Sequence, residues 1–271
     1  MTGNTAVSIV AYLTPVDEIF RCIDALALTK YVASIDIVDN SRQDYIKEAV
    51  EKLSKKHTNL VISYIASDNI GYGAANNISI RRSFLKHDIA FHLIMNSDIE
   101  FRPDIVDTLV EFMLSNPDVG MTIPMVVGLD GIEQSSYHPL PAPWDLICHR
   151  FLPRKFCAKR MERYEIKVCG KDAPVEVPYI HGCFMLIRTD VLRKIGLFDE
   201  RYFMYPEDID LTRRIAVVSK VYVIPWLKIV HAHRAESRKS LKMLRIHAVN
   251  MAKYFNKWGW IGSTRRSHPL R

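Results

Sequence analysis

The stretch FHLIMNSDIEFRPD, residues 91–104, decides how the rest of the chain is interpreted. It begins with apolar residues typical of a buried strand and continues into Asn96, Ser97 and Asp98. Ligands of open α/β sheets bind at the carboxyl ends of the strands, so Asp98 is placed to meet a metal ion bound to phosphate. The competing interpretation is an ordinary strand-ending turn, because Asn, Ser and Asp all favour local hydrogen bonds to the backbone.

Three earlier apolar segments also have the character of buried strands. They cover residues 6–13, 34–38 and 60–66, and apolar residues at helical spacing follow each of them. The second segment ends in Asp39-Asn40-Ser41, which repeats the pattern of an apolar run closed by polar residues. Strands that alternate with helices predict an α/β fold with a doubly wound, mainly parallel sheet whose carboxyl ends share one edge.

The segment NIGYGAANN, residues 69–77, follows the third of these strands and opens the next helix. Gly71 permits a close backbone approach, and Asn69 and Asn77 supply amide groups for hydrogen bonds. The segment is not a dinucleotide fingerprint, because it lacks G-x-G-x-x-G and follows the third strand rather than the first. A structural turn and a nucleotide contact both remain open here.

The second half of the chain lacks the regular alternation of strands and helices and contains a second cluster of acidic residues. Residues 128–174 are rich in proline and predict a long loop region over a site, and residues 175–180 predict one strand. Glu207, Asp208 and Asp210 then form an acidic cluster that begins a helix. Acids there complement the helix dipole, but acids after the aromatic run FMY can also lie in a partly desolvated pocket, where a carboxylate acts as a base.

Two histidines, His231 and His233, follow the strand-like segment VYVIPWLKIV, residues 221–230. A histidine at a strand end is more often a packing residue than a ligand. A hard cation near Asp98 would nevertheless lack further protein ligands, and an imidazole at the sheet edge can be the second donor.

Composition and charge bound the class of protein. The 271 residues are 48% apolar, which is enough for one large domain with a full core. No apolar run reaches the roughly 18 residues that span a bilayer, and the five cysteines are scattered without a Cys-x-x-Cys pair. We therefore expect a soluble protein of the reducing cytoplasm.

The net charge of +7 is concentrated in two basic segments, residues 150–167 and 234–271. No nucleic-acid-binding motif accompanies them, so nucleic acid is not an expected partner. Phosphorylated substrates, an anionic membrane or a solvated face fit these charges. Within the second segment, residues 241–258 predict an amphipathic helix that either packs onto protein or attaches to an anionic membrane surface.

Taken in order, these motifs resemble those of the family 2 inverting glycosyltransferases, in particular the rhamnosyltransferase-like branch that builds bacterial surface polysaccharides. The resemblance covers residues 6 to about 237 and includes HGCFMLIRTDVLRKIGLFDERYFMY (181–205) and EDIDLTRR (207–214). It implies a GT-A-type fold. Residues 1–118 would bind the nucleotide sugar, residues 119–237 would form the acceptor and catalytic half, and residues 238–271 would be a basic helical tail.

The resemblance also implies roles on the donor side. Asp39 would face the pyrimidine base, and Asn69 and Gly71 would border the nucleotide. Asp98 would hold a divalent cation, Mn²⁺ or Mg²⁺, on the diphosphate, with His231 as the second protein ligand. The full donor-binding set is Asp39, Asn40, Asn69, Gly71, Asn77, Asn96 and Asp98.

On the acceptor side, the resemblance makes Asp208 the base that takes the proton of the acceptor hydroxyl. Glu207 and Asp210 would orient that site, and His181 and Gly182 would border the acceptor. The implied reaction moves a sugar from a UDP- or dTDP-sugar to a glycan or lipid-linked glycan. We expect the enzyme in the cytoplasm, with peripheral attachment at the inner face of the plasma membrane as a further expectation.

Two other functions compete with this one. A sugar-nucleotide pyrophosphorylase would share the sheet and the metal, but it should show a Gly-rich signature with Arg and Lys after the first strand, where this chain has AYLTPVDE. A non-catalytic basic binding protein would explain the charge but not the acidic cluster. Nucleotide-dependent thermal stabilisation with manganese distinguishes a sugar transferase from such a binding module.

Overall fold

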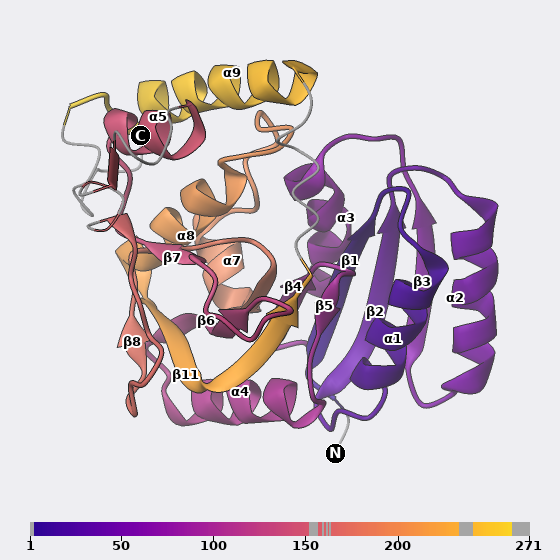
Figure 1. The fold of residues 1–271 in the computed structure, drawn as a ribbon. Coiled ribbons are helices and arrows are strands. Elements are labelled where there is room, and N and C mark those ends of the chain that lie inside the picture. Colours follow the sequence, from indigo (N-terminus) through magenta and orange to yellow (C-terminus); the bar gives the residue numbers. More distant parts are fainter. Residues whose placement is uncertain are drawn as a thin grey trace.

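The computed structural model describes residues 3–151, 157–158, 160, 162, 164–232 and 241–261. Within these residues the chain forms a mixed α/β fold around one large sheet (Figure 1). In chain order the elements are β1 (Thr5–Ala11), α1 (Val16–Leu26), β2 (Val32–Asp39), α2 (Asp44–Lys56), β3 (Val61–Ala66), α3 (Tyr72–Phe84), β4 (Phe91–Met95), β5 (Ile99–Glu100), α4 (Asp104–Ser115), β6 (Val119–Val127), β7 (Tyr137–His138), α5 (Pro143–Phe151), β8 (Val175–Glu176), β9 (Tyr179–Ile180), β10 (Phe184–Arg188), α7 (Thr189–Ile195), α8 (Glu207–Val218), β11 (Lys220–His231) and α9 (Leu241–Trp258).

The large sheet has the strand order β3-β2-β1-β4-β10-β6-β11-β5, and β8 also pairs with β11. Strands β1, β2 and β3 are parallel to their neighbours and β4 is parallel to β1, whereas β10 runs antiparallel between β4 and β6. Because β11 is parallel to β6, the carboxyl ends of β1, β2, β4, β6 and β11 all lie at one edge. This edge gathers the predicted site residues of both halves.

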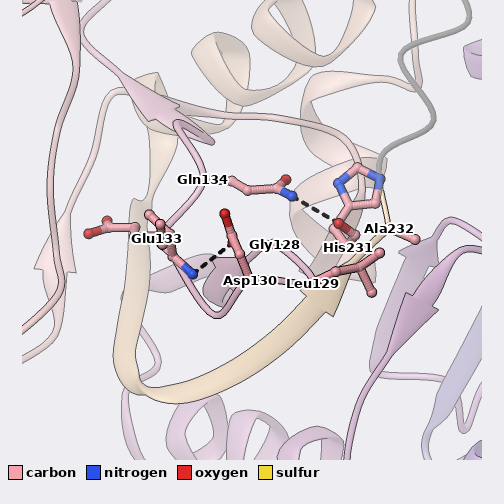
Figure 2. A pocket seen from close by; sticks show the side chains of 8 residues that line it. Gly128, Leu129, Asp130, Glu133, Gln134, His231 and Ala232 are labelled. Carbon is pink, nitrogen blue, oxygen red and sulfur yellow. Dashed lines mark hydrogen bonds between the residues drawn. The ribbon is translucent and has the colours of Figure 1, made fainter.

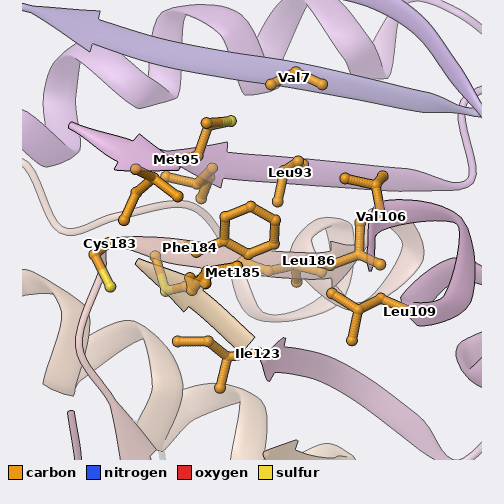
Figure 3. Close-up of a cluster of buried hydrophobic side chains, with 14 of the residues drawn as sticks. Val7, Leu93, Met95, Val106, Leu109, Ile123, Cys183, Phe184, Met185 and Leu186 are labelled. Carbon is orange, nitrogen blue, oxygen red and sulfur yellow. The ribbon is translucent and has the colours of Figure 1, made fainter. Parts of the chain in front are cut away.

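The main core lies between the middle strands and the helices that cover them. Figure 3 shows Leu93 and Met95 of β4 facing Phe184 and Leu186 of β10, with Leu109 of α4 beside them. All five side chains are fully buried. Burial of this kind contributes about 1.5–3 kcal/mol for each large apolar side chain, so β10 is firmly held next to β4.

Most of the predicted elements are confirmed, including the helix over residues 241–258. The single strand predicted over residues 175–180 is wrong. It divides into β8, which pairs with β11, and β9, which pairs with β7 in a separate two-stranded sheet. Pro178 lies between the two strands, and its missing N–H cannot join a strand ladder. The proline-rich region 128–174, predicted as loop, contains β7 and α5.

Helix α9 packs onto the acceptor half of its own chain. Met251, Tyr254, Phe255 and Trp258 are buried in a second apolar cluster that also contains Ile209 of α8. Of the two interpretations of this amphipathic helix, packing onto protein is therefore the one observed for its buried face. No helix among the described residues is long and apolar enough to cross a membrane.

Candidate active site

Asp98 and His231 face each other at the carboxyl edge of the sheet. Strand β5 pairs with the end of β11 so that His231 lies opposite Ile99, and the Ala232 amide donates to the Asp98 carbonyl at 3.2 Å. This pairing places His231 Nε2 3.4 Å from Asp98 Oδ1, with both side chains largely buried. The predicted metal ligands are thus brought together from positions 133 residues apart (231 − 98) by a short antiparallel pairing.

The chemistry of this pair fits a divalent cation. A carboxylate oxygen suits hard cations such as Mg²⁺ and Mn²⁺, whereas imidazole favours the transition metals, so the mixed pair suits Mn²⁺ better than Mg²⁺. Within the described part of the chain no group of three or more His, Cys, Asp or Glu side chains could hold a metal. Further ligands would have to come from a bound diphosphate or water. The alternative ligand His233 lies outside the described residues.

Asp39, at the end of β2, is fully buried and faces its own loop. Its Oδ1 accepts hydrogen bonds from the Ser41 amide at 2.9 Å and the Ser41 hydroxyl at 2.7 Å. Its Oδ2 accepts from the Gln43 amide at 2.6 Å and from the Tyr64 hydroxyl at 3.0 Å. These four bonds show that Asp39 shapes the loop 39–43. Any contact of Asp39 with a nucleotide base would use the same carboxylate.

Asn40 and Gly71 link this loop to the start of α3. The Asn40 side-chain amide donates to the Gly71 carbonyl at 3.3 Å, while its buried Oδ1 has no hydrogen-bond partner. Gly71 has φ +94°, and a Cβ at this position would lie 2.2 Å from the carbonyl oxygen of Phe203. The glycine is therefore required for a close approach within the chain itself, in addition to any approach by a nucleotide.

The other two predicted asparagines differ in their surroundings. Asn69 is exposed at the sheet edge. Asn77 is fully buried in α3, where its amide donates to the Phe198 carbonyl and to Glu200 Oε1, each at 2.9 Å, and accepts from the Phe198 amide at 3.0 Å. All of these contacts tie α3 to the loop after α7, so the geometry gives Asn77 a structural role and no direct path to a nucleotide.

Asp208 lies in the first turn of α8 and is held against the start of β10. The Gly182 amide donates to Asp208 Oδ2 at 3.1 Å, and the Ile209 amide donates to Oδ1 at 2.8 Å. The Tyr72 hydroxyl donates to the Gly182 carbonyl at 2.6 Å, so the backbone amide and the carbonyl of Gly182 are both held by hydrogen bonds. A Cβ on Gly182 would come within 3.3 Å of the Asp208 Cβ, so the glycine permits this approach.

Gly182 and Cys183 connect the carboxylate of Asp208 to the metal-ligand pair. The Asn96 amide, two residues before Asp98, donates to the Cys183 carbonyl at 2.9 Å. Burial raises the pKa of the Cys183 thiol to about 12, and the charges of Asp98 and Asp208 both add to this effect. Residues 182–183 thus contact both segments: Gly182 binds the Asp208 carboxylate, and Cys183 binds the backbone at Asn96, two residues before Asp98.

The neighbouring acids Glu207 and Asp208 are both less acidic than usual. Burial raises the pKa of Asp208 from 3.8 to about 6, against the opposing effect of the two backbone amides. Burial and the charge of Asp208 raise the pKa of Glu207 from 4.5 to about 8. Glu207 Oε2 is buried without a hydrogen-bond partner. At neutral pH the pair therefore holds an ionised Asp208 next to a protonated Glu207.

Asp210 faces away from this site, so among the described residues its hydrogen bonds do not reach the Asp208 carboxylate, and it could orient that carboxylate only through helix α8. Its carboxylate is fully buried and accepts from Arg214 Nε at 2.9 Å, from Trp258 Nε1 at 2.7 Å and from Lys257 Nζ at 2.7 Å. Because Asp208 and Asp210 are two positions apart on a helix, they point to different faces. The third acid of the cluster contacts α9, and any effect on the base is indirect.

His181 lies at the edge of an aromatic stack that borders the Asp208 site. Its ring is 5.1 Å from that of His138 and 5.9 Å from that of Tyr179. His138 stacks on both Tyr179 and Tyr164, and the hydroxyls of these two tyrosines are 3.2 Å apart. The stack supports His181 beside Gly182, and the placement of both residues at the acceptor side stays a prediction.

A hollow of about 400 Å³ opens next to the metal-ligand pair, between the ends of β6 and β11. The loop 128–134 forms one wall, and His231 and Ala232 form the other (Figure 2). The Gln134 side-chain amide donates to the His231 carbonyl at 2.8 Å, so this loop helps to hold the histidine in place. No single residue of this loop was predicted to have a role.

Sequence reasoning also missed Tyr72 and Tyr12. Tyr72 links α3 to Gly182, but its only sequence signal was its place inside the motif 69–77. Tyr12 and Leu13 follow β1 at the same sheet edge and are both more than half exposed, and Leu13 has φ +51°. Exposed apolar residues and a left-handed non-glycine residue are unusual together, and they mark this turn as a candidate part of the donor side.

Solved structures of similar fold define the class of protein. The crystal structure of GalNAc-T7 with UDP, GalNAc and Mn²⁺ has a TM-score of 0.71 at 17% identity, over 97% of this chain and 49% of that one. The mannosyltransferase PcManGT from Pyrobaculum calidifontis, in complex with GDP-Man and Mn²⁺, has a TM-score of 0.61 at 16% identity, over 94% of this chain and 65% of that one. The fold is that of the GT-A glycosyltransferases.

The family follows from the sequence itself. The model of glycosyl transferase family 2 matches residues 7–196, and the chain therefore belongs to this family. An N-acetylglucosaminyl-diphospho-decaprenol L-rhamnosyltransferase of Mycobacterium tuberculosis is 28% identical over 254 residues, which is 88% of this chain and 78% of the relative. Rhamnosyltransferase WbbL of Escherichia coli is 24% identical over 247 residues, 81% of this chain and 91% of the relative. The protein is a glycosyltransferase of glycan synthesis that takes a nucleotide-sugar donor and a glycan acceptor.

Proposed function

We propose that this enzyme transfers a deoxyhexose of the rhamnose type, with inversion, from a UDP- or dTDP-sugar to a hydroxyl of a lipid-linked glycan. One observation carries the proposal more than any other. Asp208, with a pKa raised to about 6, is held by the Gly182 amide at 3.1 Å beside the Asp98–His231 pair. A base next to a metal-ligand pair is what a direct displacement at the sugar requires.

In this mechanism each group has one task. Asp98 and His231 would hold the divalent cation, which would supply positive charge against the departing nucleoside diphosphate. Asp208 is ionised at neutral pH and accepts the proton of the acceptor hydroxyl as the new glycosidic bond forms. Gly182 and Ile209 fix the direction of that carboxylate through their amides. Protonated Glu207 adds no second negative charge beside the base.

Asp39 and its loop remain our proposal for the nucleoside end of the donor. The loop 39–43 is preformed by the four hydrogen bonds to Asp39, and exposed Tyr12 lies at the same edge. A preformed loop with an exposed aromatic ring suits a planar base, because little order has to be created on binding. We assign Asn40, Asn69 and Asn96, which follow the carboxyl ends of β2, β3 and β4, to the same donor side.

The sugar and the acceptor are proposed from the names of relatives. Both relatives described above are named as rhamnosyltransferases, and one name specifies a diphospho-decaprenol acceptor. His181 and its aromatic stack lie beside Asp208, where a sugar ring of the acceptor could pack against them.

A lipid-linked acceptor would bring the enzyme to a membrane, and we propose peripheral attachment to the inner face of the plasma membrane. The buried face of α9 is not available for this contact. Exposed apolar side chains remain nearby, namely Trp144 on α5 and Ile261 after α9, with exposed fractions of 55% and 98%. Helices α5 and α9 lie together at one end of the molecule and share an apolar cluster (Figure 1).

The membrane contact is tested by flotation with vesicles of anionic or zwitterionic lipid. The double variant Trp144→Ser/Ile261→Ser should lose binding to anionic vesicles. The control is Leu85→Ser, which removes an apolar side chain that is 82% exposed at the end of α3. Equal binding by both variants and the wild type would remove this surface from the proposal.

The function is tested with a panel of UDP-, dTDP- and GDP-sugars, each combined with a polyprenyl-diphospho-N-acetylglucosamine acceptor and Mn²⁺. We expect nucleoside diphosphate release from the dTDP- or UDP-sugar with a rhamnose-type sugar, dependent on acceptor and metal. Inversion is read from the anomeric configuration of the product. A retained configuration, or release only from GDP-sugars, contradicts the proposal.

A further inference from the structure

Helix α9 contacts the helix of the base through a buried set of polar groups. Trp258 Nε1 and Lys257 Nζ both reach Asp210 Oδ1, each at 2.7 Å. The guanidinium of Arg213 lies 4.1 Å from the centre of the Trp258 ring and donates to the Tyr254 hydroxyl at 3.1 Å. Asp210 and Arg213 are 0% and 1% exposed, so these bonds are shielded from water and hold the first two turns of α8.

The same helix also holds the loop that leads into α8. The Asn250 side-chain amide donates to the Met204 carbonyl at 3.0 Å, and Lys253 Nζ donates to the Arg201 carbonyl at 2.8 Å. Between these two points, the Phe203 carbonyl accepts from the Tyr72 amide at 3.1 Å. Tyr72 in turn fixes Gly182, the residue that donates to Asp208. Both routes from α9 therefore end at the carboxylate of Asp208.

The start of α8 needs such support because it has no cap of its own. Pro206 occupies the N-cap position, and no side chain there accepts from the amides of the first turn. First turns without an N-cap side chain fray, and in this one the Ile209 amide donates to Asp208 itself. Asp210, two residues beyond Asp208, is a fully buried anchor, and its partners on α9 are Lys257 and Trp258.

We propose that Lys257 and Trp258 are positioning residues for the transfer reaction, which keep the Asp208 carboxylate against Gly182 by anchoring α8 and its preceding loop to α9. The inference rests on the proposed base role of Asp208. It assigns to the C-terminal helix a part in catalysis although none of its residues contacts the reacting groups. Displacement of a catalytic group by about 1 Å can cost on the order of 100-fold in rate, so a small loosening of this anchor has a measurable effect.

The test uses a matched pair of tryptophan variants. Trp258→Phe removes the indole donor to Asp210 but keeps a ring under Arg213. Trp260→Phe makes the same chemical change two residues away, where the indole donates only to Asn256 at 2.8 Å and is half exposed. Lys257→Met and Lys257→Arg form a second pair. Met removes the positive charge, whereas Arg keeps it at a position that is only partly buried.

The first readout needs no substrate. Hydrogen exchange of the Gly182 amide reports the bond to Asp208 directly, and the amides of Ser41 and Gln43, bound to Asp39, report the far half of the molecule. In Trp258→Phe and Lys257→Met we expect the Gly182 amide to exchange at least about tenfold faster, with Ser41 and Gln43 unchanged. Trp260→Phe and Lys257→Arg should behave as the wild type.

The second readout is turnover with the active sugar nucleotide from the donor panel. We expect kcat to fall about 10- to 100-fold in Trp258→Phe and Lys257→Met, with donor affinity within about twofold of the wild type. Two results overturn the inference: unchanged Gly182 exchange and kcat in both variants, or a parallel loss of protection at all three amides, which would mean plain destabilisation. Normal transfer by Asp208→Asn would instead refute the proposed function, while the Gly182 exchange would still decide the anchoring.

Discussion

Activity at mildly acidic pH tests the environment of Asp208 in a quantitative way. A carboxylate base must be ionised to accept a proton, so a raised pKa shifts the acid limb of the pH–rate profile to higher pH. With a pKa of about 6, about 9% of Asp208 is ionised at pH 5, whereas the ordinary value of 3.8 would leave about 94% ionised. We expect kcat at pH 5 to be about tenfold below its plateau and to fall about tenfold per further pH unit.

The assay measures nucleoside diphosphate release between pH 4.5 and 8.5 at saturating donor, acceptor and Mn²⁺. The residual activity of Asp208→Asn is measured over the same range, because a limb produced by any other group would persist in this variant. If Asp208 is the titrating group, this residual activity has no limb near pH 6. A wild-type plateau that extends down to pH 4.5, or the same limb in Asp208→Asn, refutes the reasoning.

Three further predictions follow from the described contacts. Asp98→Ala should abolish turnover and the thermal stabilisation by Mn²⁺ with UDP or dTDP, and His231→Ala should weaken metal dependence more than His233→Ala. Retained activity in Asp98→Ala, or the reverse ranking of the two histidine variants, reassigns the metal ligands. Glu207→Gln should raise stability relative to the wild type at pH 8 but not at pH 4. The raised folded-state pKa of Glu207 makes the stability of the wild type fall by up to about 1.4 kcal/mol per pH unit as pH rises from 4.5 toward 8. Equal urea midpoints of the two proteins at pH 8 would contradict this. Gly71→Ala should cost about 1–3 kcal/mol of stability, since a side chain there is strained and meets the Phe203 carbonyl, and an unchanged melting temperature would disprove that contact.

The sequence predicted the sheet edge well because strands and helices alternate with clear periodicities. Asp98 and Asp208 were found because each follows an apolar or aromatic run, a pattern that places polar groups at the end of an element. A histidine partner for Asp98 was expected because a cation there would need a second donor, and the resemblance then selected His231 over His233. The pairing of Asp98 with His231 depends on a two-residue antiparallel strand, β5, which is too short to leave a periodic signal.

The roles of Asp210, Asn77 and Gly71 could not be read from the sequence, because their partners are distant in the chain. Asp210 bonds to a helix 48 residues away, and Asn77 bonds to a loop 121 residues away. Spacing indicates that a helix has an apolar face but not which surface covers it, so the packing of α9 also required the structure. Acids in one motif, such as Asp208 and Asp210, thus acquire separate functions from the faces on which they lie.

The most direct test of the account is the variant Asp208→Asn, with transfer and nucleotide affinity measured on one preparation. Asn keeps the shape and one of the two hydrogen bonds from Gly182 and Ile209, because its single carbonyl oxygen replaces only one of the two acceptors, and it removes the basic oxygen. The account predicts that UDP or dTDP affinity with Mn²⁺ and the melting temperature stay close to those of the wild type, while transfer falls on the order of 100- to 10,000-fold. Near-normal transfer by a folded, nucleotide-binding Asp208→Asn would contradict it.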